Sequence, residues 1–128
     1  MAISQFGKTA EKQATYEVQG RQTGSVNEFY VANALDGIGL EYDFQQSLRG
    51  GYKAGGFVVD FIVYTPFPVP LEVFGDHWHT GSLSSGDRYR LDVIEGIYRR
   101  KVEIIWGRES DTQEKAEDSV RRLFEGVS

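Results

Sequence analysis

The sequence predicts a single mixed α/β domain whose elements follow one another as α-β-β-β-α-β-α. Three observations favour this fold class: a run of β-branched and aromatic residues over 57–64, segments of helical apolar spacing on either side of it, and glycine- or proline-rich connections between elements. With 128 residues, 40% apolar and 26% charged, the chain is long enough for one buried core. We expect residues 25–128 to form this domain and residues 1–24 to form an N-terminal arm or an extra element.

The first predicted helix covers about residues 26–36. Ser25 and Glu28 have the spacing of a capping box, in which each side chain binds a backbone amide near the other residue. Residues 40–48 partly alternate between apolar and polar and are predicted to form a strand. A glycine-rich loop follows over residues 49–56.

Residues 57–64 are predicted to form a strand that is buried on both faces, because nearly all of them are apolar or aromatic. All three prolines of the chain lie within Pro66–Pro70, which predicts a tight connection. Residues 71–74 then form a second buried strand, and residues 75–81 leave it as a loop.

The last third of the chain predicts a helix over about residues 87–99, a strand over 101–106 and a final helix that opens on a capping box at Asp111. Helical spacing places the following residues on the inner face of the earlier helix: Tyr89, Val93, Ile94 and Ile97. The same pattern places the following residues of the final helix inward: Ala116, Val120, Leu123 and Phe124.

The composition excludes some classes of protein. The chain has no cysteine, so it has neither disulfides nor cysteine-based zinc sites, and a cytoplasmic protein is the simplest interpretation. No apolar run approaches the roughly 18 residues of a membrane span, and no secretory signal is recognisable at the N-terminus. A net charge of −5 argues mildly against a protein that coats nucleic acid by bulk attraction.

Two carboxylates interrupt the apolar strands. Asp60 lies within the 57–64 strand and Glu72 within the 71–74 strand, where an unpaired charge costs several kcal/mol. If the hairpin turns near Pro66, the two acids face each other on the same side of the sheet. A hard cation such as Mg²⁺ or Mn²⁺ between them would remove the repulsion. The alternative is that each acid pairs with an arginine or a lysine.

Both histidines, His77 and His79, directly follow the second acidic strand. Histidine takes or gives a proton near neutral pH, so the pair is a candidate for acid–base chemistry. A packed loop around Trp78 is the simpler alternative. Zinc binding by the two histidines is a weaker one, because no cysteine supports it.

Other candidates have competing structural roles. Glu28 is explained by its capping box, although a helix-borne acid can also point over the edge of the sheet as a third carboxylate. Arg88 and Arg90 at the start of the second helix, or Arg99 at its end, are candidate phosphate contacts, and solvated helix faces are the alternative. Lys53 is a further candidate, in a loop that lacks the ending of a P-loop.

The order of elements and the acids at Glu28, Asp60 and Glu72 resemble the core of the PD-(D/E)XK nuclease superfamily. Within it, Val59–Phe61 and the run Leu71–His79 are most similar to the very-short-patch-repair endonucleases and related homing endonucleases. The resemblance spans roughly residues 25–125.

The resemblance implies a restriction-endonuclease-like fold and a Mg²⁺- or Mn²⁺-dependent DNA endonuclease. Asp60 would be the central metal ligand, with Glu72 and Glu28 as the other acids. His79, or alternatively His77, would transfer the proton. Phe74 stands where the superfamily has a lysine, which puts a lysine-based mechanism in doubt.

A domain of this size has little surface for reading a long site, so a homodimer or a DNA-reading partner protein is expected. A non-catalytic nuclease-like module and an RNA-cleaving enzyme are the alternatives.

Overall fold

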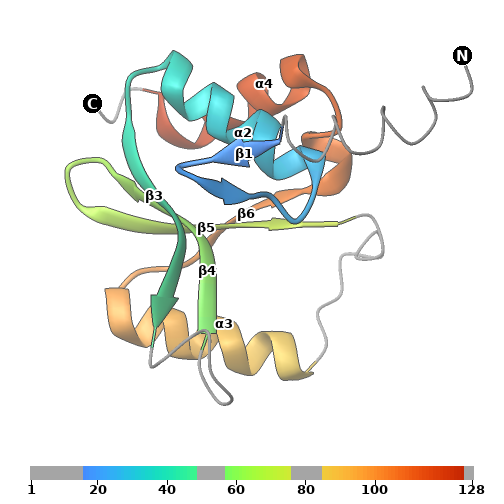
Figure 1. The fold of residues 1–128 in the computed structure, drawn as a ribbon. Helices are drawn as coiled ribbons and strands as arrows, with labels where there is room; N and C mark the ends of the chain where they lie inside the picture. The colour runs from blue at the N-terminus through green and yellow to red at the C-terminus, as the bar shows by residue number, and fades with distance from the viewer. Residues whose placement is uncertain (1–15, 49–56, 76–84, 126–128) are drawn as a thin grey trace, which may run out of the picture.

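A four-stranded mixed sheet forms the centre of the computed structural model, which describes residues 16–48, 57–75 and 85–125 (Figure 1). Its strands lie in the order β3 (Glu41–Leu48), β4 (Phe57–Tyr64), β5 (Pro68–Phe74) and β6 (Glu103–Trp106). The pairs β3–β4 and β4–β5 are antiparallel, whereas β5 and β6 are parallel. The fold is therefore a small α/β domain with a mixed sheet, and the order of elements from residue 26 onward is the predicted one.

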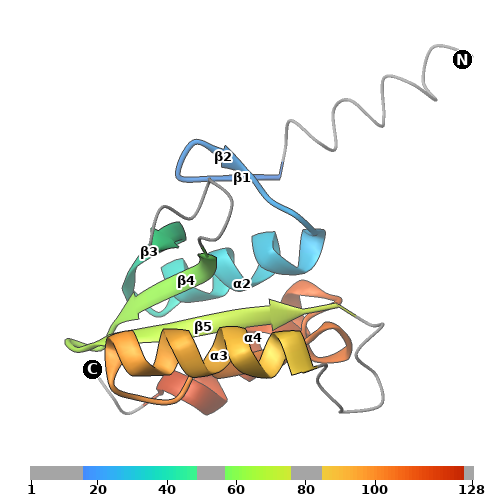
Figure 2. The ribbon, with the colours of Figure 1, turned by 90° about the horizontal axis from the view of Figure 1, so that it is seen from below.

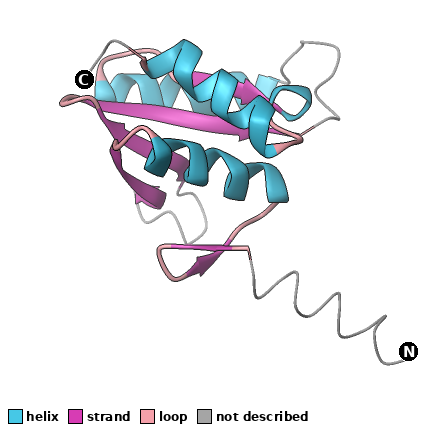
Figure 3. Cartoon of the chain, turned by 90° about the horizontal axis from the view of Figure 1, so that it is seen from above, coloured by secondary structure: helices cyan, strands magenta, loops and turns pink. Residues whose placement is uncertain are grey.

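Helices cover both faces of this sheet. α2 (Val26–Gly37) and α4 (Gln113–Phe124) pack against each other on one face, which Figure 3 shows from above. α3 (Ser85–Tyr98) lies along β5 on the opposite face (Figure 2). A 3-10 turn, η2 (Gly107–Glu109), connects β6 to α4. None of the helices in the described part of the chain is long and apolar enough to cross a membrane.

The core is divided by the sheet into two clusters of buried side chains. The larger cluster joins the sheet to α2 and α4, and its fully buried members include Leu35, Phe61, Leu71 and Val120. The smaller cluster joins the sheet to α3 and includes Ile62, Phe74, Leu91 and Ile94. The inward face predicted for α4 is confirmed, since Ala116, Val120 and Phe124 are buried and Leu123 packs against them.

The inner face predicted for α3 is partly wrong. Leu91 and Ile94 are buried, but the side chains of Tyr89 and Ile97 are 63% and 41% exposed. Two stripes of residues along this helix have helical spacing: the predicted one contains Tyr89 and Ile97, and the other contains Leu91 and Tyr98. Packing against β5 selects the stripe that continues to Tyr98.

The turn in the proline-rich segment is shorter than predicted. β5 begins at Pro68 instead of residue 71, and Pro68 and Pro70 pair with Tyr64 and Ile62 of β4. The β5–β6 ladder starts only at Leu71, so β5 has one neighbour over its first three residues. A proline is tolerated there because a strand with an open side does not need every amide hydrogen.

Other boundaries differ by one or two residues. α3 covers 85–98 instead of 87–99, and β6 begins at residue 103 instead of 101. The N-cap of α4 is Thr112, whose side chain accepts from the Lys115 amide at 3.1 Å. Asp111, the predicted cap, instead forms an exposed ion pair with Lys115.

Residues 17–22 form a small hairpin of β1 (Glu17–Val18) and β2 (Arg21–Gln22). Its two turn residues, Gln19 and Gly20, both have positive φ angles, as a tight hairpin turn requires. The Gln19 side chain donates to the Tyr42 carbonyl and accepts from the Phe44 amide, which fixes the hairpin to β3. This part of the predicted N-terminal segment is therefore an extra element on the domain.

Candidate functional site

Asp60 and Glu72 lie next to each other across β4 and β5. The ladder pairs Phe61 with Leu71, and one further step in the same register places Asp60 opposite Glu72, as predicted for a turn near Pro66. The Asp60 amide donates to Glu72 Oε2 at 2.8 Å, and the Val73 amide donates to Asp60 Oδ2 at 2.8 Å. Each carboxylate is therefore bound to the other strand's backbone.

The neighbouring ladder is interrupted at the same level. β3 pairs with β4 at Phe44–Phe61 and at Gln46–Val59, and the residues between them, Gln45 and Asp60, are left out of the register. Gln45 has a φ of 55°, in the left-handed region that few non-glycine residues adopt. The β3–β4 ladder is therefore irregular beside Asp60, and the unusual backbone conformation is on β3, the neighbouring strand.

Glu72 is buried and paired with an arginine. Its side chain is 1% exposed, and its Oε1 accepts from Nη1 of Arg90, in the second turn of α3. Nη2 of the same guanidinium donates to the Val58 carbonyl, so Arg90 connects β4 and β5. The alternative in which the acid pairs with an arginine thus holds for Glu72. The Arg90 guanidinium, predicted to contact DNA, is instead bound within the protein.

Glu28 combines a cap with a place near the strand acids. The Ser25 hydroxyl accepts from the Glu28 amide at 3.3 Å, and Glu28 Oε1 accepts from the Gly24 amide at 3.3 Å. The Ser25 half of the predicted capping box is therefore present, whereas the Glu28 carboxylate accepts from the Gly24 amide and from the Ser25 hydroxyl instead of from the Ser25 amide. A Cβ at residue 24 would lie 3.0 Å from Glu28 Oε2, so glycine makes room for the carboxylate.

The three acids influence one another electrostatically. Burial raises the pKa of Asp60 well above its ordinary value, and the charges of Glu72 and Glu28 raise it further. The Val73 amide and Arg90 oppose this shift. Burial also raises the pKa of Glu28, with a smaller contribution from Glu72. The structure thus brings these three predicted acids into one electrostatic cluster.

The carboxylates do not converge on a single point. Across residues 16–48, 57–75 and 85–125, no group of three histidine, aspartate or glutamate side chains is arranged to hold a metal ion. Glu28 is turned toward Gly24 and Glu72 toward Arg90. The donor set is nevertheless composed of carboxylate oxygens on helix and strand backbones, the chemistry that hard divalent cations prefer.

The remaining predicted residues are dispersed. His77, His79 and Lys53 lie outside the described residues. Arg88 and Arg99 are exposed near the two ends of α3, and Arg99 ends the helix with a φ of 56°.

Phe74, which the predicted resemblance aligns with a lysine, is 7% exposed. Its ring packs against Trp106 with centroids 5.5 Å apart. The side chain at this position is therefore part of the core beneath α3.

Sequence reasoning missed the internal role of Arg90. The residue lies four positions before Ile94, so it shares a helix face with that buried side chain. An arginine on an apolar helix face, in a chain with two acids in apolar strands, was the available indication.

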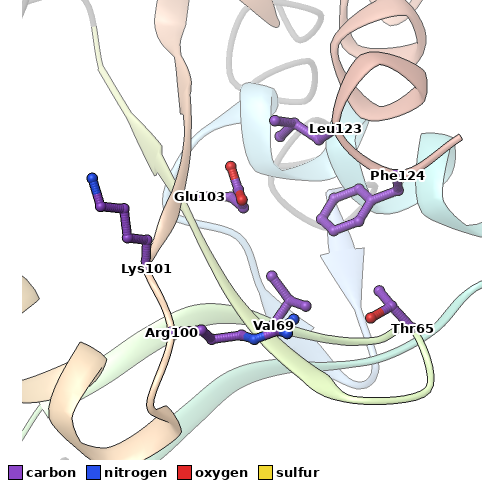
Figure 4. A pocket seen from close by; sticks show the side chains of 7 residues that line it. All are labelled: Thr65, Val69, Arg100, Lys101, Glu103, Leu123 and Phe124. Carbon is purple, nitrogen blue, oxygen red and sulfur yellow. The ribbon is translucent and has the colours of Figure 1, made fainter. Parts of the chain in front are cut away.

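A cavity of about 320 Å³ lies away from the acid cluster (Figure 4). It adjoins the β4–β5 turn and the C-terminal end of α4, and it is lined by Thr65, Val69, Arg100, Lys101, Glu103, Leu123 and Phe124. None of the three clustered acids contributes to it.

Comparison with protein-family models, with curated proteins and with solved structures found no match to this chain.

Proposed function

We propose that this chain is a metal-dependent DNA endonuclease whose centre contains Asp60 and Glu72. The observation that carries the proposal is the pair of acids held side by side on β4 and β5, with Glu28 close enough to raise the pKa of Asp60. A buried acid whose pKa is strongly raised by neighbouring carboxylates is typical of functional sites, because catalytic groups require shifted pKa values.

The topology supports this proposal. A helix carrying Glu28, a strand carrying Asp60 and a strand carrying Glu72 follow one another in the order that the resemblance to PD-(D/E)XK nucleases implies. The assignment of the domain to the restriction-endonuclease-like fold is part of the proposal.

The proposed cofactor is Mg²⁺ or Mn²⁺, held by Asp60 and Glu72 with Glu28 as a third acid. When bound, such a cation would polarise the scissile phosphate and lower the pKa of an attacking water. The strand backbone fixes the two central carboxylates, because each accepts a hydrogen bond from a backbone amide of the neighbouring strand. Proton transfer by His79, or alternatively His77, remains a prediction.

The proposed substrate is DNA, contacted through its phosphates. Arg88 and Arg99 are exposed and free of the acid cluster's ion pair, so they remain candidates, together with Lys53. Arg90 is not proposed as a direct contact in the metal-free protein. A homodimer or a partner protein that reads DNA is proposed to supply sequence recognition, since the domain itself is small.

The test is cleavage of supercoiled plasmid by the pure protein with Mg²⁺ or Mn²⁺. We expect conversion to nicked or linear DNA, loss of cleavage in Asp60→Asn and in Glu72→Gln, and unchanged cleavage in Glu103→Gln. Glu103 is a matched control because it is a partly buried acid of the neighbouring strand that lines the separate cavity. Absence of cleavage, or its persistence in both acid variants, would refute the proposal.

A non-catalytic binding or assembly module is the second candidate. Two observations favour it: Phe74 fills the place of the lysine within the core, and Glu72 already has a cationic partner in Arg90. This candidate predicts no heat of Mn²⁺ binding in calorimetric titration, whereas the endonuclease predicts binding that Asp60→Asn abolishes. Matched DNA and RNA substrates distinguish an RNA-cleaving enzyme on the same site.

A further inference from the structure

Arg90 is held by two groups under α3. One guanidinium nitrogen donates to Glu72 Oε1 and the other donates to the Val58 carbonyl, so the side chain spans both central strands. The Arg90 side chain is still 26% exposed, whereas Glu72 is 1% exposed. The ion pair is therefore buried on the acid's side and reachable by solvent on the arginine's side.

Each oxygen of Glu72 already accepts a hydrogen bond. Oε1 accepts from Arg90, and Oε2 accepts from the Asp60 amide at 2.8 Å. The second bond belongs to the strand backbone and positions the carboxylate. The bond from Arg90 is made by a long, flexible side chain. Oε1 is therefore the oxygen that becomes available to a cation when the Arg90 guanidinium moves away.

Arg90 supplies the charge that a cation would otherwise supply. Its guanidinium lies against Glu72 Oε1, and the other oxygen of the same carboxylate is bound to the Asp60 amide. A divalent ion at the same carboxylates would neutralise the same charges at the same place. Two cations against one buried carboxylate repel each other, so their binding is mutually exclusive at Oε1.

We infer that Arg90 is an internal counter-ion of the metal-free site, and that a divalent cation binds Glu72 only by exchanging with the Arg90 guanidinium. This inference rests on the proposed function, because it assumes that Asp60 and Glu72 hold a metal. Arg90 is then a positioning residue: it keeps Glu72 oriented before loading and lowers the apparent metal affinity. The released guanidinium lies beside the site, where a phosphate is the matching anion.

The test compares wild type with Arg90→Met by Mn²⁺ calorimetry and by melting temperature with and without Mn²⁺. We expect Mn²⁺ to bind Arg90→Met about tenfold more tightly, because no competing ion pair has to be broken. In EDTA the variant should melt below wild type, since Glu72 is left buried without a cationic partner. Mn²⁺ should then raise its melting temperature by more than it raises that of wild type.

The matched control is Arg122→Met on α4, away from the acid cluster. This change removes the same charge together with the ion pair between Arg122 and Glu109. Its Mn²⁺ affinity should equal that of wild type. Arg90→Lys keeps the charge without the two-nitrogen fork, so it should show a smaller gain in affinity. It also keeps the test open if Arg90→Met does not fold.

The outcomes separate the two proposals. Equal or weaker Mn²⁺ binding in the Arg90 variants, with wild type binding Mn²⁺ and cutting plasmid, would overturn the exchange and leave the proposed function standing. Failure of wild type and of every Arg90 variant to bind Mn²⁺ would overturn both.

Discussion

Asp60 and Glu72 are joined by a hydrogen bond from the Asp60 amide to Glu72 Oε2, and a second bond, from the Val73 amide to Asp60 Oδ2, ties the Asp60 carboxylate to the strand of Glu72. The charges repel while the geometry holds the groups together. Their surroundings are nevertheless unequal, because Arg90 binds Glu72 directly and acts on Asp60 only through its charge. Replacing Asp60 by its neutral amide and replacing Glu72 by its neutral amide should therefore change the free energy of unfolding in opposite directions.

In the metal-free protein we expect Asp60→Asn to raise the free energy of unfolding at pH 7 and Glu72→Gln to lower it. The first change removes a disfavoured charge while an amide oxygen remains to accept from Val73. The second leaves Arg90 without its acid. Breaking a buried ion pair from one side costs about 3–5 kcal/mol, and the partial exposure of Arg90 reduces this loss. Urea unfolding in EDTA measures both changes, and equal signs would contradict this prediction.

We expect the metal-free protein to lose stability as the pH rises above about 4, near the ordinary pKa of an aspartate. Between that pKa and the raised pKa of folded Asp60, the folded chain keeps a proton that the unfolded chain has released. The resulting stabilisation is lost as the pH rises through the folded pKa, and the raised pKa of Glu28 adds a slope of the same sign. Melting temperatures in EDTA across this range should show the decline, and Asp60→Asn should flatten it. An equally steep decline in the variant would assign it to other groups.

The start of α4 offers a test of capping against ion pairing. Thr112→Ala should lower the free energy of unfolding by about 1 kcal/mol, because the Lys115 amide loses its acceptor. Asp111→Ala should lower it by less than about 0.5 kcal/mol, because the pair with Lys115 is exposed. Denaturant unfolding of the two variants measures the difference. A larger loss in Asp111→Ala would make residue 111 the cap.

The face of α3 that packs on the sheet can be tested by truncation. Ile94→Ala should cost about 2–5 kcal/mol, since the side chain is completely buried beneath the helix. Tyr89→Ser should change the free energy of unfolding by no more than about 0.5 kcal/mol, since most of its side chain is exposed. Thermal unfolding of both variants provides the measurement. A severe loss in Tyr89→Ser would mean that the predicted stripe packs inward after all.

The sequence predicts most of the fold because its local patterns are distinct. Residues 57–64 form a strand with the predicted bounds, and the turn near Pro66 sets the register that aligns Asp60 with Glu72. The features that the sequence does not predict depend on which residues become neighbours only after folding. The start of β5 at Pro68 requires knowledge that β6 pairs only from Leu71 onward, and two rotations of α3 satisfy the same periodicity.

The site is predicted less completely than the fold. The two strand acids stand out because a charge within an apolar strand is conspicuous in the sequence itself. The ion pair between Arg90 and Glu72 is not conspicuous, because it joins two residues 18 positions apart and depends on how α3 is rotated against β5. Arginine at the start of a helix has the same appearance in a sequence whether it meets solvent, a phosphate or a buried acid.

Glu28 has two roles to separate, a helix cap and a third acid. Glu28→Gln keeps an oxygen that can accept from the Gly24 amide but removes the charge that raises the pKa of Asp60. We expect this variant to fold with stability close to wild type and to lose plasmid cleavage together with affinity for Mn²⁺. Ser25→Ala is the matched control: it removes the acceptor of the Glu28 amide and the hydroxyl that donates to Glu28 Oε2, but it keeps the Glu28 charge, so it should cost about 1 kcal/mol while cleavage persists below the melting temperature. If Glu28→Gln cleaves plasmid as well as wild type does, the residue is a cap alone and the metal is held by the two strand acids.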